Sequence, residues 1–297
     1  MESGGIRIGT CSWTEKSLIE SGAFYPEGVA TAEQRLKFYA SHFDTVEVDS
    51  SYYAIPTSHM VSAWTERTPK GFLFHLKAYG ALTGHGIDPK TLPRELRELL
   101  PAADRDQENI RIEEPAVLKA VAQASVAALE PLRAARKLGF IIFQFPPWFG
   151  YKKANLDYIL YCKELMAGLP IAVEFRHGSW LTHHHADAVF GFLREHRITY
   201  IPCDEPQYGT LATAPFIPEA TTAMAYLRLH GRNAENWRTH STPRYDYLYD
   251  QGELKEFAGV AQRLSAKARM IFIMFNNCHV GHAVRNALQL QDILKRA

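Results

Sequence analysis

Short apolar segments recur along the whole chain, and nearly every one leads into a stretch with helical spacing. The predicted strands are residues 6–11, 45–49, 72–77, 139–145, a segment beginning at 171, 198–203, 225–230 and 270–275. The predicted helices are residues 31–41, 58–67, 94–100, 115–138, 153–167, 184–196, 251–268 and 281–295. This alternation is typical of parallel α/β folds, and eight units predict a TIM-type (β/α)₈ barrel. An open doubly wound sheet is the alternative, but no Gly-x-Gly-x-x-Gly fingerprint or P-loop follows a strand.

The length and composition fit one large folded unit. The chain has 297 residues, of which 46% are hydrophobic, and a barrel usually takes ~250 residues. We therefore predict a single domain, 1–297, with an insertion at about 78–114 after the third strand. An insertion of this length is usually a lid, a binding segment or partly mobile. The net charge of +1 gives no global basic field that would indicate nucleic acid.

The sequence gives no sign of export or of a membrane. There is no signal-peptide pattern at Met1, and no apolar run approaches the ~20 residues that a membrane helix needs. The four cysteines are widely spaced and form no Cys-x-x-Cys pair, which indicates neither a disulfide framework nor a zinc ribbon. We expect a cytoplasmic protein with reduced thiols. Any cofactor and the oligomeric state stay open.

The fifth strand carries charge where a buried strand should not. Ile171, Val173 and Phe175 are apolar, whereas Glu174 and Arg176 lie on the opposite face, because strand side chains alternate with period 2. Burying two opposite charges costs folding free energy unless they pair with each other, and such charges are otherwise retained for binding or catalysis. Polar residues end the other strands too: Cys11, Ser12, Glu47, Asp49, His75, Lys77, Gln144, Asp204, Arg228, His230 and Asn276. The intervening apolar residues are expected to face the helices: Val46, Val48, Phe74, Leu76, Leu227 and Leu229.

A barrel has its active site at the carboxyl ends of its strands, which predicts a site built from these residues. We assign proton transfer to Glu174, with Asp49 and His230 as further acid/base groups. A guanidinium binds phosphate or carboxylate with two parallel bonds. The predicted substrate contacts are Lys77, Arg176, Arg228, Asn276, Gln144, Tyr53 and Trp180. The alternative is a self-neutralising network that serves packing alone, with members Glu47, Asp49, Glu174, Lys77, Arg176 and Arg228.

Other residue types at the strand ends are less specific. We predict no metal site, because no His-x-His or His-Glu-x-x-His spacing supports one. His75 and His230 are each acid/base groups, metal ligands or hydrogen-bonded structural histidines. Buried unreactive thiols are the favoured interpretation of Cys11, Cys203 and Cys278. The loops after the strands contain Trp13, Tyr52, Tyr53, Trp148, Phe149, Trp180, Trp237 and Tyr245. These rings either stack on bases or sugars or cover the top of the core.

Several motifs spaced along the chain share one resemblance. They are IGT (8–10), FYP (24–26), TVEVDSSYY (45–53), FQFPP (143–147), VEFRHGSW (173–180), YLRLHG (226–231) and FNN (275–277). In these motifs the chain resembles the YecE-like family, catalogued as domain of unknown function 72. The resemblance implies a TIM-type barrel and supplies no reaction. Asp49 stands where the family commonly has Asn, Cys11 where it has Ser, and Cys278 where it has His, which weakens a metal site there.

Three functional hypotheses follow. The first is a hydrolase- or isomerase-like enzyme acting on a small anionic substrate, a phosphorylated sugar or a nucleotide-like molecule, at the strand ends. The second is a barrel that binds nucleic acid or processes phosphodiesters, using the Arg- and Tyr-rich loop 231–249 and the aromatic rings. The third is a non-catalytic binding protein.

Overall fold

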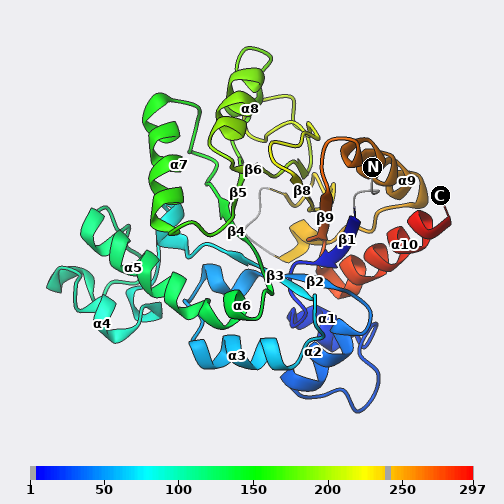
Figure 1. The fold of residues 1–297 in the computed structure, drawn as a ribbon, viewed down its shortest axis with the longest axis horizontal. Coiled ribbons are helices and arrows are strands. Elements are labelled where there is room, and N and C mark those ends of the chain that lie inside the picture. Colours follow the sequence, from blue (N-terminus) through cyan, green and yellow to red (C-terminus); the bar gives the residue numbers. More distant parts are fainter. Residues whose placement is uncertain (1–4, 238–241, 297) are drawn as a thin grey trace.

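The computed structural model describes residues 5–237 and 242–296. Its strands lie at the centre and its helices surround them (Figure 1). The strands in the described ranges are β1 (Gly5–Thr10), β2 (Thr45–Val48), β3 (Leu73–Lys77), β4 (Leu138–Gln144), β5 (Ile171–Glu174), β6 (Thr199–Tyr200), β7 (Cys203–Asp204), β8 (Met224–Leu229) and β9 (Met270–Phe275). They form two parallel sheets with the orders β1-β9-β8-β7 and β2-β3-β4-β5-β6. The chain is therefore an α/β fold with parallel sheets, as the alternation of strands and helices predicted.

The two sheets meet where β1 runs beside β2. Cys11 forms an isolated parallel bridge with Glu47, and the Ser12 N–H donates to the Glu47 carbonyl at 2.8 Å. The backbone pairing of β1 thus continues onto the first strand of the other sheet.

The sheets also meet at β6 and β7. The strand predicted over 198–203 is interrupted here, because Pro202 has no N–H to donate to a ladder. Ile201 nevertheless donates to Val173 of β5 at 2.9 Å, and the Pro202 carbonyl accepts from Arg228 of β8 at 3.1 Å. One short segment therefore pairs with β5 on one side and with β8 on the other.

The helices in the described ranges are α1 (Lys16–Ser21), α2 (Ala32–Ala40), α3 (Ser58–Glu66), α4 (Arg94–Arg97), α5 (Pro115–Ala128), α6 (Glu130–Ala134), α7 (Lys153–Leu165), α8 (Ala186–Glu195), α9 (Gln251–Ser265) and α10 (His282–Arg296). The prediction of a single helix over 115–138 is wrong, because the structure has two helices there, α5 and α6. Pro131 lies in the first turn of α6, where its missing N–H fits a helix start but not a helix interior. Of these helices, none combines the length and apolar character needed to cross a bilayer.

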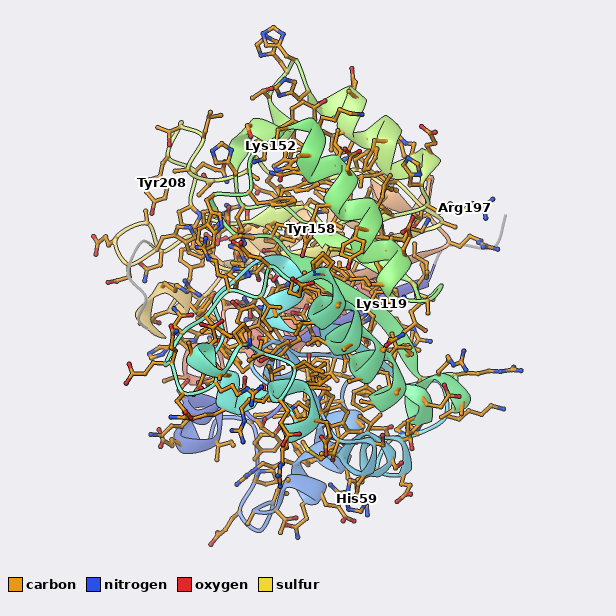
Figure 2. The ribbon with its side chains drawn as sticks, turned by 90° about the vertical axis from the view of Figure 1, so that its left-hand side faces the viewer. His59, Lys119, Lys152, Tyr158, Arg197 and Tyr208 are labelled. Atoms are coloured by element: carbon orange, nitrogen blue, oxygen red, sulfur yellow. The ribbon has the colours of Figure 1, made fainter. Side chains whose placement is uncertain are left out.

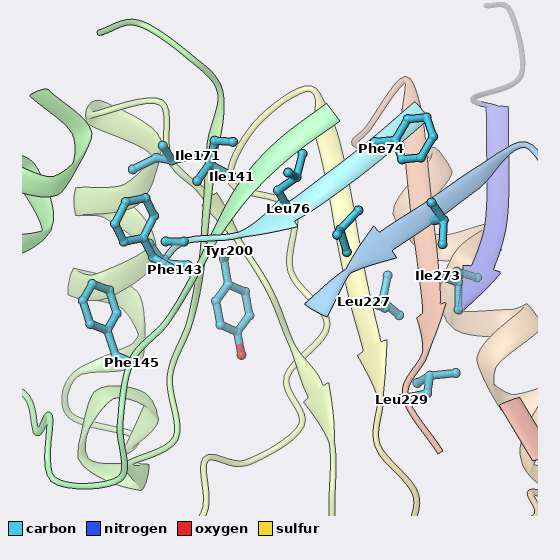
Figure 3. Close-up of a cluster of buried hydrophobic side chains, with 14 of the residues drawn as sticks. Phe74, Leu76, Ile141, Phe143, Phe145, Ile171, Tyr200, Leu227, Leu229 and Ile273 are labelled. Carbon is cyan, nitrogen blue, oxygen red and sulfur yellow. The ribbon is translucent and has the colours of Figure 1, made fainter. Parts of the chain in front are cut away.

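Strand side chains separate into an outer and an inner layer, as predicted. Phe74, Leu76, Leu227 and Leu229 belong to the large cluster that also includes helix residues (Figure 3). A second cluster is formed by the opposite face of the strands: Cys11, Phe140, Ile142, Ala172, Ile201, Cys203, Tyr226, Phe272 and Met274. The apolar set between the polar strand-end residues therefore faces the helices.

Parallel strands bring all their carboxyl ends to one side of the molecule. In Figure 2, Tyr208, which follows β7, lies toward the left edge, whereas Arg197, which precedes β6, lies toward the right edge. We call the side on which the strands end the mouth.

The insertion 78–114 is packed onto the body of the protein. It contains α4 and the 3₁₀ helices Gly80–Thr83, Pro89–Thr91 and Ala102–Asp104. Ile87 and Ile110 form an antiparallel bridge, and Leu82, Leu92 and Leu96 are buried in the large cluster. Apolar anchoring of this kind opposes free movement of the segment. That residues 1–297 form a single domain stays a prediction.

Candidate active site

Arg228 lies at the centre of a buried charge network. Strand β8 directs its side chain inward, between Glu47 of β2 and Glu174 of β5. Its Nη2 is 2.7 Å from Glu47 Oε1 and its Nη1 is 2.5 Å from Glu174 Oε2, and all three side chains are 0% exposed. Nη1 also donates to Gln144 Oε1 at 2.9 Å. Buried charges are tolerated when they are paired and hydrogen-bonded, and Arg228 meets this condition with partners from three strands.

Arg176 follows β5 and extends the network toward the mouth. Its Nε faces Glu174 Oε1 in an ion pair, and its Nη1 donates to Glu205 Oε2 at 2.6 Å. Its Nη2 contacts His230 Nε2 at 3.0 Å. Glu174 is therefore shared by two arginines, and Arg176 is held by two carboxylates and one imidazole.

His230 is neutral in this arrangement, with a defined tautomer. A guanidinium can only donate, so His230 Nε2 accepts from Arg176 and the ring proton lies on Nδ1. Nδ1 is 2.7 Å from the side-chain amide of Asn276, which must therefore present its oxygen to that proton. Burial, and next the charge of Arg176, lower the pKa of His230 well below its usual value. His230 thus positions Arg176.

Three charged side chains form the partly exposed rim of the network. Lys77, Arg176 and Asp49 have side-chain exposures of 13%, 11% and 29%. Asp49 Oδ1 is 3.8 Å from Lys77 Nζ and 3.7 Å from Arg228 Nη2. Burial lowers the pKa of Lys77, although Asp49 acts in the opposite direction. These three side chains are the partly exposed members of the charge network.

The buried carboxyl groups differ in their protonation. Burial acts to raise the pKa of Glu174, but Arg176 and Arg228 outweigh it and hold this pKa well below its usual value. Burial raises the pKa of Glu47 to about 7 despite the nearby Arg228. Burial also raises the pKa of Glu205 to about 7, with Arg176 opposing. The network therefore contains one carboxylate that stays ionised and two carboxyl groups that exchange protons near neutral pH.

The charges of this network nearly cancel. Its acids are Glu47, Asp49, Glu174 and Glu205, and its bases are Lys77, Arg176 and Arg228. One proton held by Glu47 or Glu205 makes the set neutral. Both arginines are already paired with carboxylates. An added anion would therefore favour the protonated forms of Glu47 and Glu205.

The structure brings most of the predicted site residues together. Those in mutual contact are Glu174, Asp49, His230, Lys77, Arg176, Arg228, Asn276 and Gln144. Tyr53 is 68% exposed and contacts the ring of Tyr52 at 4.9 Å. Tyr52 is the ring that lies beneath Lys77 Nζ, 4.8 Å away. Tyr53 is thus one ring removed from the charged rim, and its role stays a prediction.

The structure places Trp180, a predicted substrate contact, in the core. Its side chain is fully buried, stacked on Phe175 at 4.2 Å and on Phe149 at 5.7 Å. Its Nε1–H donates to the Phe149 carbonyl at 2.5 Å. An indole with both its ring and its N–H engaged in the core stabilises the loop after β5 and does not reach the mouth.

Glu205, which pairs with Arg176, is a member of the network that the sequence analysis missed. Asp204 was chosen at this strand end, but it accepts from Arg232 Nε at 3.0 Å and from the Tyr249 hydroxyl at 2.7 Å, away from the network. Cys203 and Glu205 lie on the other alternation, and Cys203 belongs to the inner cluster. The period-2 pattern continued through Glu205 would have found it.

Two aromatic residues of the loop after β8 cover part of the network. The rings of Trp237 and Tyr245 lie 5.9 Å and 6.3 Å from the His230 ring, and the Arg176 guanidinium is 5.7 Å from the Trp237 ring. Residues 238–241, in the predicted Arg- and Tyr-rich loop, lie outside the described residues.

Two trios of potential metal ligands occur in the described ranges: Glu174, Cys203 and His230, and Cys11, Glu47 and Asp49. Each trio adjoins a guanidinium, since Arg176 donates to His230 and Arg228 Nη2 is 3.8 Å from Cys11 Sγ. Burial also raises the pKa of both thiols well above the usual value. A cation would therefore meet positive charge and protonated sulfur, and we assign neither trio to a metal.

The comparisons with known proteins show which family the chain belongs to. The family model described as "Protein of unknown function DUF72" matches residues 7–297. The chain belongs to the DUF72 family. This is the family that its motifs resemble.

Relatives of this DUF72 protein match it along nearly their whole length. The UPF0759 protein YunF of Bacillus subtilis is 31% identical over 296 residues, covering 97% of this chain and 94% of that protein. A DUF72 protein of Thermotoga maritima superimposes with a TM-score of 0.78 at 30% identity, covering 98% and 99% of the two chains. A DUF72 protein of Enterococcus faecalis gives a TM-score of 0.78 at 27% identity, covering 98% and 95%. These descriptions name no reaction.

Proposed function

We propose that this DUF72 protein is an enzyme that binds a small anionic substrate at the mouth and acts on it by acid–base chemistry. The observation that carries the proposal is the rim of Lys77, Arg176 and Asp49, which lies partly exposed over a buried and nearly neutral network. Two cations beside one carboxylate are suited to hold an anionic group next to a proton acceptor. If the network served packing alone, the three rim charges would not need to lie partly exposed at the mouth.

The proposed framework of the site is a closed (β/α)₈ barrel formed by residues 1–297 as one domain. The Cys11–Glu47 bridge and the shared segment of β6 and β7 support it, because they join the two sheets at both edges. In such a barrel the strand ends form one active-site face.

We assign different roles to the carboxyl groups. Asp49 is the proposed acid/base group that touches substrate, because it is the most exposed of the four. Glu174 instead holds Arg176 and Arg228 in place, since both arginines keep it ionised. Glu47 and Glu205 act as proton reservoirs beneath the rim.

Anion binding should be coupled to proton uptake. A negative charge between Lys77 and Arg176 raises the pKa of the nearby Glu47 and Glu205 further above 7, so a proton is taken up near neutral pH. Affinity should therefore fall as the pH rises between about 6 and 8. Isothermal titration with sulfate, which does not itself titrate in this range, in two buffers of different ionisation enthalpy measures the uptake directly.

Variants of the rim test the site. Lys77→Ala should weaken sulfate binding about tenfold or more, whereas Lys16→Ala, at an 85% exposed side chain on α1, should not. Asp49→Asn should tighten sulfate binding, because it removes a repelling charge, and should abolish turnover once a substrate is known. Equal sulfate affinity in all these proteins would refute the anion site.

The nucleic-acid hypothesis stays an alternative. It requires phosphate contacts along a strand, which make binding steeply dependent on salt. A titration with a short single-stranded oligonucleotide at two salt concentrations separates it from binding of a small anion. Binding of anions without any turnover across substrate classes would favour the third hypothesis, a non-catalytic binding protein.

A further inference from the structure

Four aromatic rings form a continuous strip beside the rim. Tyr53 contacts Tyr52 at 4.9 Å, Tyr52 contacts His85 at 5.3 Å, and His85 contacts Trp148 at 5.6 Å. The residues come from the loop after β2, the insertion 78–114 and the loop after β4. Three separate segments therefore supply one row of rings at the mouth.

The two ends of this aromatic strip are exposed. Tyr53 is 68% exposed and Trp148 is 58% exposed. Rings that only cover a core are buried, as Trp180 is at 0%. Large aromatic side chains left in water at a mouth are typical of a surface that receives a ligand.

Cations accompany the strip along its length. Lys77 Nζ lies 4.8 Å from the centre of the Tyr52 ring, and the Arg111 guanidinium lies 5.0 Å from the centre of the Trp148 ring. Burial and then the charges of Lys77, Arg111 and Arg176 lower the pKa of His85 to about 4. The strip is therefore surrounded by positive charge, and its histidine is neutral at physiological pH.

His85 offers one hydrogen-bond acceptor to a ligand. The Thr83 hydroxyl donates to the Gly80 carbonyl at 3.0 Å, so toward His85 Nδ1, 2.8 Å away, it can only accept. The ring proton of His85 thus lies on Nδ1, and Nε2 has a free lone pair. Within the part of the chain that the structure describes, Nε2 has no hydrogen-bond partner.

We propose that the aromatic strip binds the base of a nucleoside monophosphate whose phosphate is held by Lys77 and Arg176. The rings provide stacking surface for a planar base, His85 Nε2 accepts from a base N–H, and Lys77 joins the strip to the anion site. This rests on the proposed function and narrows its substrate class from small anions in general to nucleotides. A phosphorylated sugar would use the rim but leave the rings unoccupied.

The experiment compares ligands that share a phosphate but differ in the base. AMP, CMP and ribose 5-phosphate are titrated calorimetrically into the full chain at one salt concentration. We expect the nucleotides to bind about tenfold or more tightly than ribose 5-phosphate, the typical contribution of base–aromatic stacking. Trp148→Ala should remove most of this difference and leave the affinity for ribose 5-phosphate unchanged.

Two further variants make the test specific. His85→Phe keeps the ring but removes the acceptor, and should weaken AMP binding severalfold without changing ribose 5-phosphate binding. Leu99→Ala, at a 53% exposed apolar residue of the same insertion, is the control and should change neither affinity.

The outcomes separate this proposal from the function on which it rests. Equal affinities for AMP and ribose 5-phosphate, unaffected by Trp148→Ala, would overturn the base site while the anion site stands. Loss of binding to all three ligands and to sulfate would overturn both. Binding confined to a single-stranded oligonucleotide, with a steep salt dependence, would replace the mononucleotide by nucleic acid and overturn the proposal.

Discussion

His75 of β3 and His230 after β8 are both fully buried inside the sheets, but their partners are of different kinds. His75 Nδ1 accepts from the Phe140 N–H at 3.0 Å, so its Nε2 carries the proton and donates to Thr45 Oγ1 at 3.0 Å. The rings of Phe272 and Tyr226 pack against it at 4.5 Å and 4.9 Å. His230 is instead bound to the cation Arg176 and to an amide.

This contrast extends to two regions of the interior. We call the set Phe140, Tyr226, Phe272 and His75 the apolar layer, and the set Glu47, Glu174, Glu205, Arg176 and Arg228 the charged layer. In the apolar layer His75 has only neutral hydrogen-bond partners, and the Tyr226 hydroxyl donates across to Glu47 of the charged layer at 2.9 Å. The charged layer is equally buried except for Arg176, whose side chain is 11% exposed, and buried ion pairs of this kind could be replaced by apolar residues at little cost in stability. We propose that its charges, which lie beneath the mouth, serve binding or chemistry, and the following predictions test that distinction.

The largest effect is expected for Arg228→Met. It leaves Glu47 and Glu174 buried without their shared cation, which should lower the free energy of unfolding by about 3–5 kcal/mol. Phe272→Leu, the matched change in the apolar layer, should cost less than about 1.5 kcal/mol. Urea unfolding followed by circular dichroism measures both. If Arg228→Met is as stable as Phe272→Leu, the two layers do not differ in the way proposed.

A pH effect of up to about 3 kcal/mol for each of two carboxyl groups should belong to the charged layer alone. Glu47 and Glu205 have a pKa of about 7 in the folded chain, against an ordinary value of 4.5. Between these values the folded state keeps protons that the unfolded state has lost, so the stability they contribute falls as the pH rises from about 4.5 to about 7. For each group the rise in pKa corresponds to about 3 kcal/mol at most.

Glu174 contributes to the pH dependence of stability with the opposite sign and over a different pH range. Its lowered pKa gives stability that is present above its ordinary pKa and is lost as the pH falls through the folded value. Glu47→Gln should therefore reduce the pH dependence of the free energy of unfolding between about pH 4.5 and pH 7. It should leave unchanged the loss of stability at lower pH that comes from Glu174. Urea unfolding across this range tests it; an unchanged slope would mean that Glu47 is ionised throughout.

Replacing either buried histidine by alanine should have an effect of intermediate size. For His75 we expect the effect on stability alone, and for His230 also on sulfate affinity. His75→Ala leaves the Phe140 N–H and the Thr45 hydroxyl without their buried partner, which should cost about 1–3 kcal/mol. It should not alter sulfate affinity. His230→Ala should lower sulfate affinity, because it frees the Arg176 guanidinium from a group that positions it. If both variants change only stability, His230 is structural in the same sense as His75.

The period-2 pattern of the strands predicted most of the charged layer from sequence. Glu174 and Arg176 share one face of their segment, as do Arg228 and His230, and parallel strands bring these faces together at one end. The pattern failed at Glu205 because Pro202 interrupts the sixth predicted strand, and the alternation was not continued through the break.

Contacts between loops could not be predicted in the same way. Trp180 follows a strand end and is aromatic, which predicted a residue at the mouth. Its ring instead packs between Phe149 and Phe175, and no local sequence pattern predicts these contacts. Likewise, the raised pKa of Glu47 depends on its complete burial, which is a property of the assembled sheets. Periodicity thus reveals which face a strand residue occupies, whereas burial and partners arise from tertiary packing.

The smallest change in stability is expected for Lys77→Met, although Lys77 belongs to the same network. Its Nζ is 3.8 Å from Asp49 Oδ1 in a partly exposed ion pair, a class of interaction that contributes about 0–1 kcal/mol. Burial already lowers the pKa of Lys77, so an apolar side chain of similar length recovers part of what the charge costs. We expect urea unfolding to shift by less than about 1 kcal/mol while sulfate affinity falls about tenfold. A destabilisation comparable to that of Arg228→Met would instead place Lys77 in the charged layer, and the rim would lose its proposed role as the surface that meets substrate.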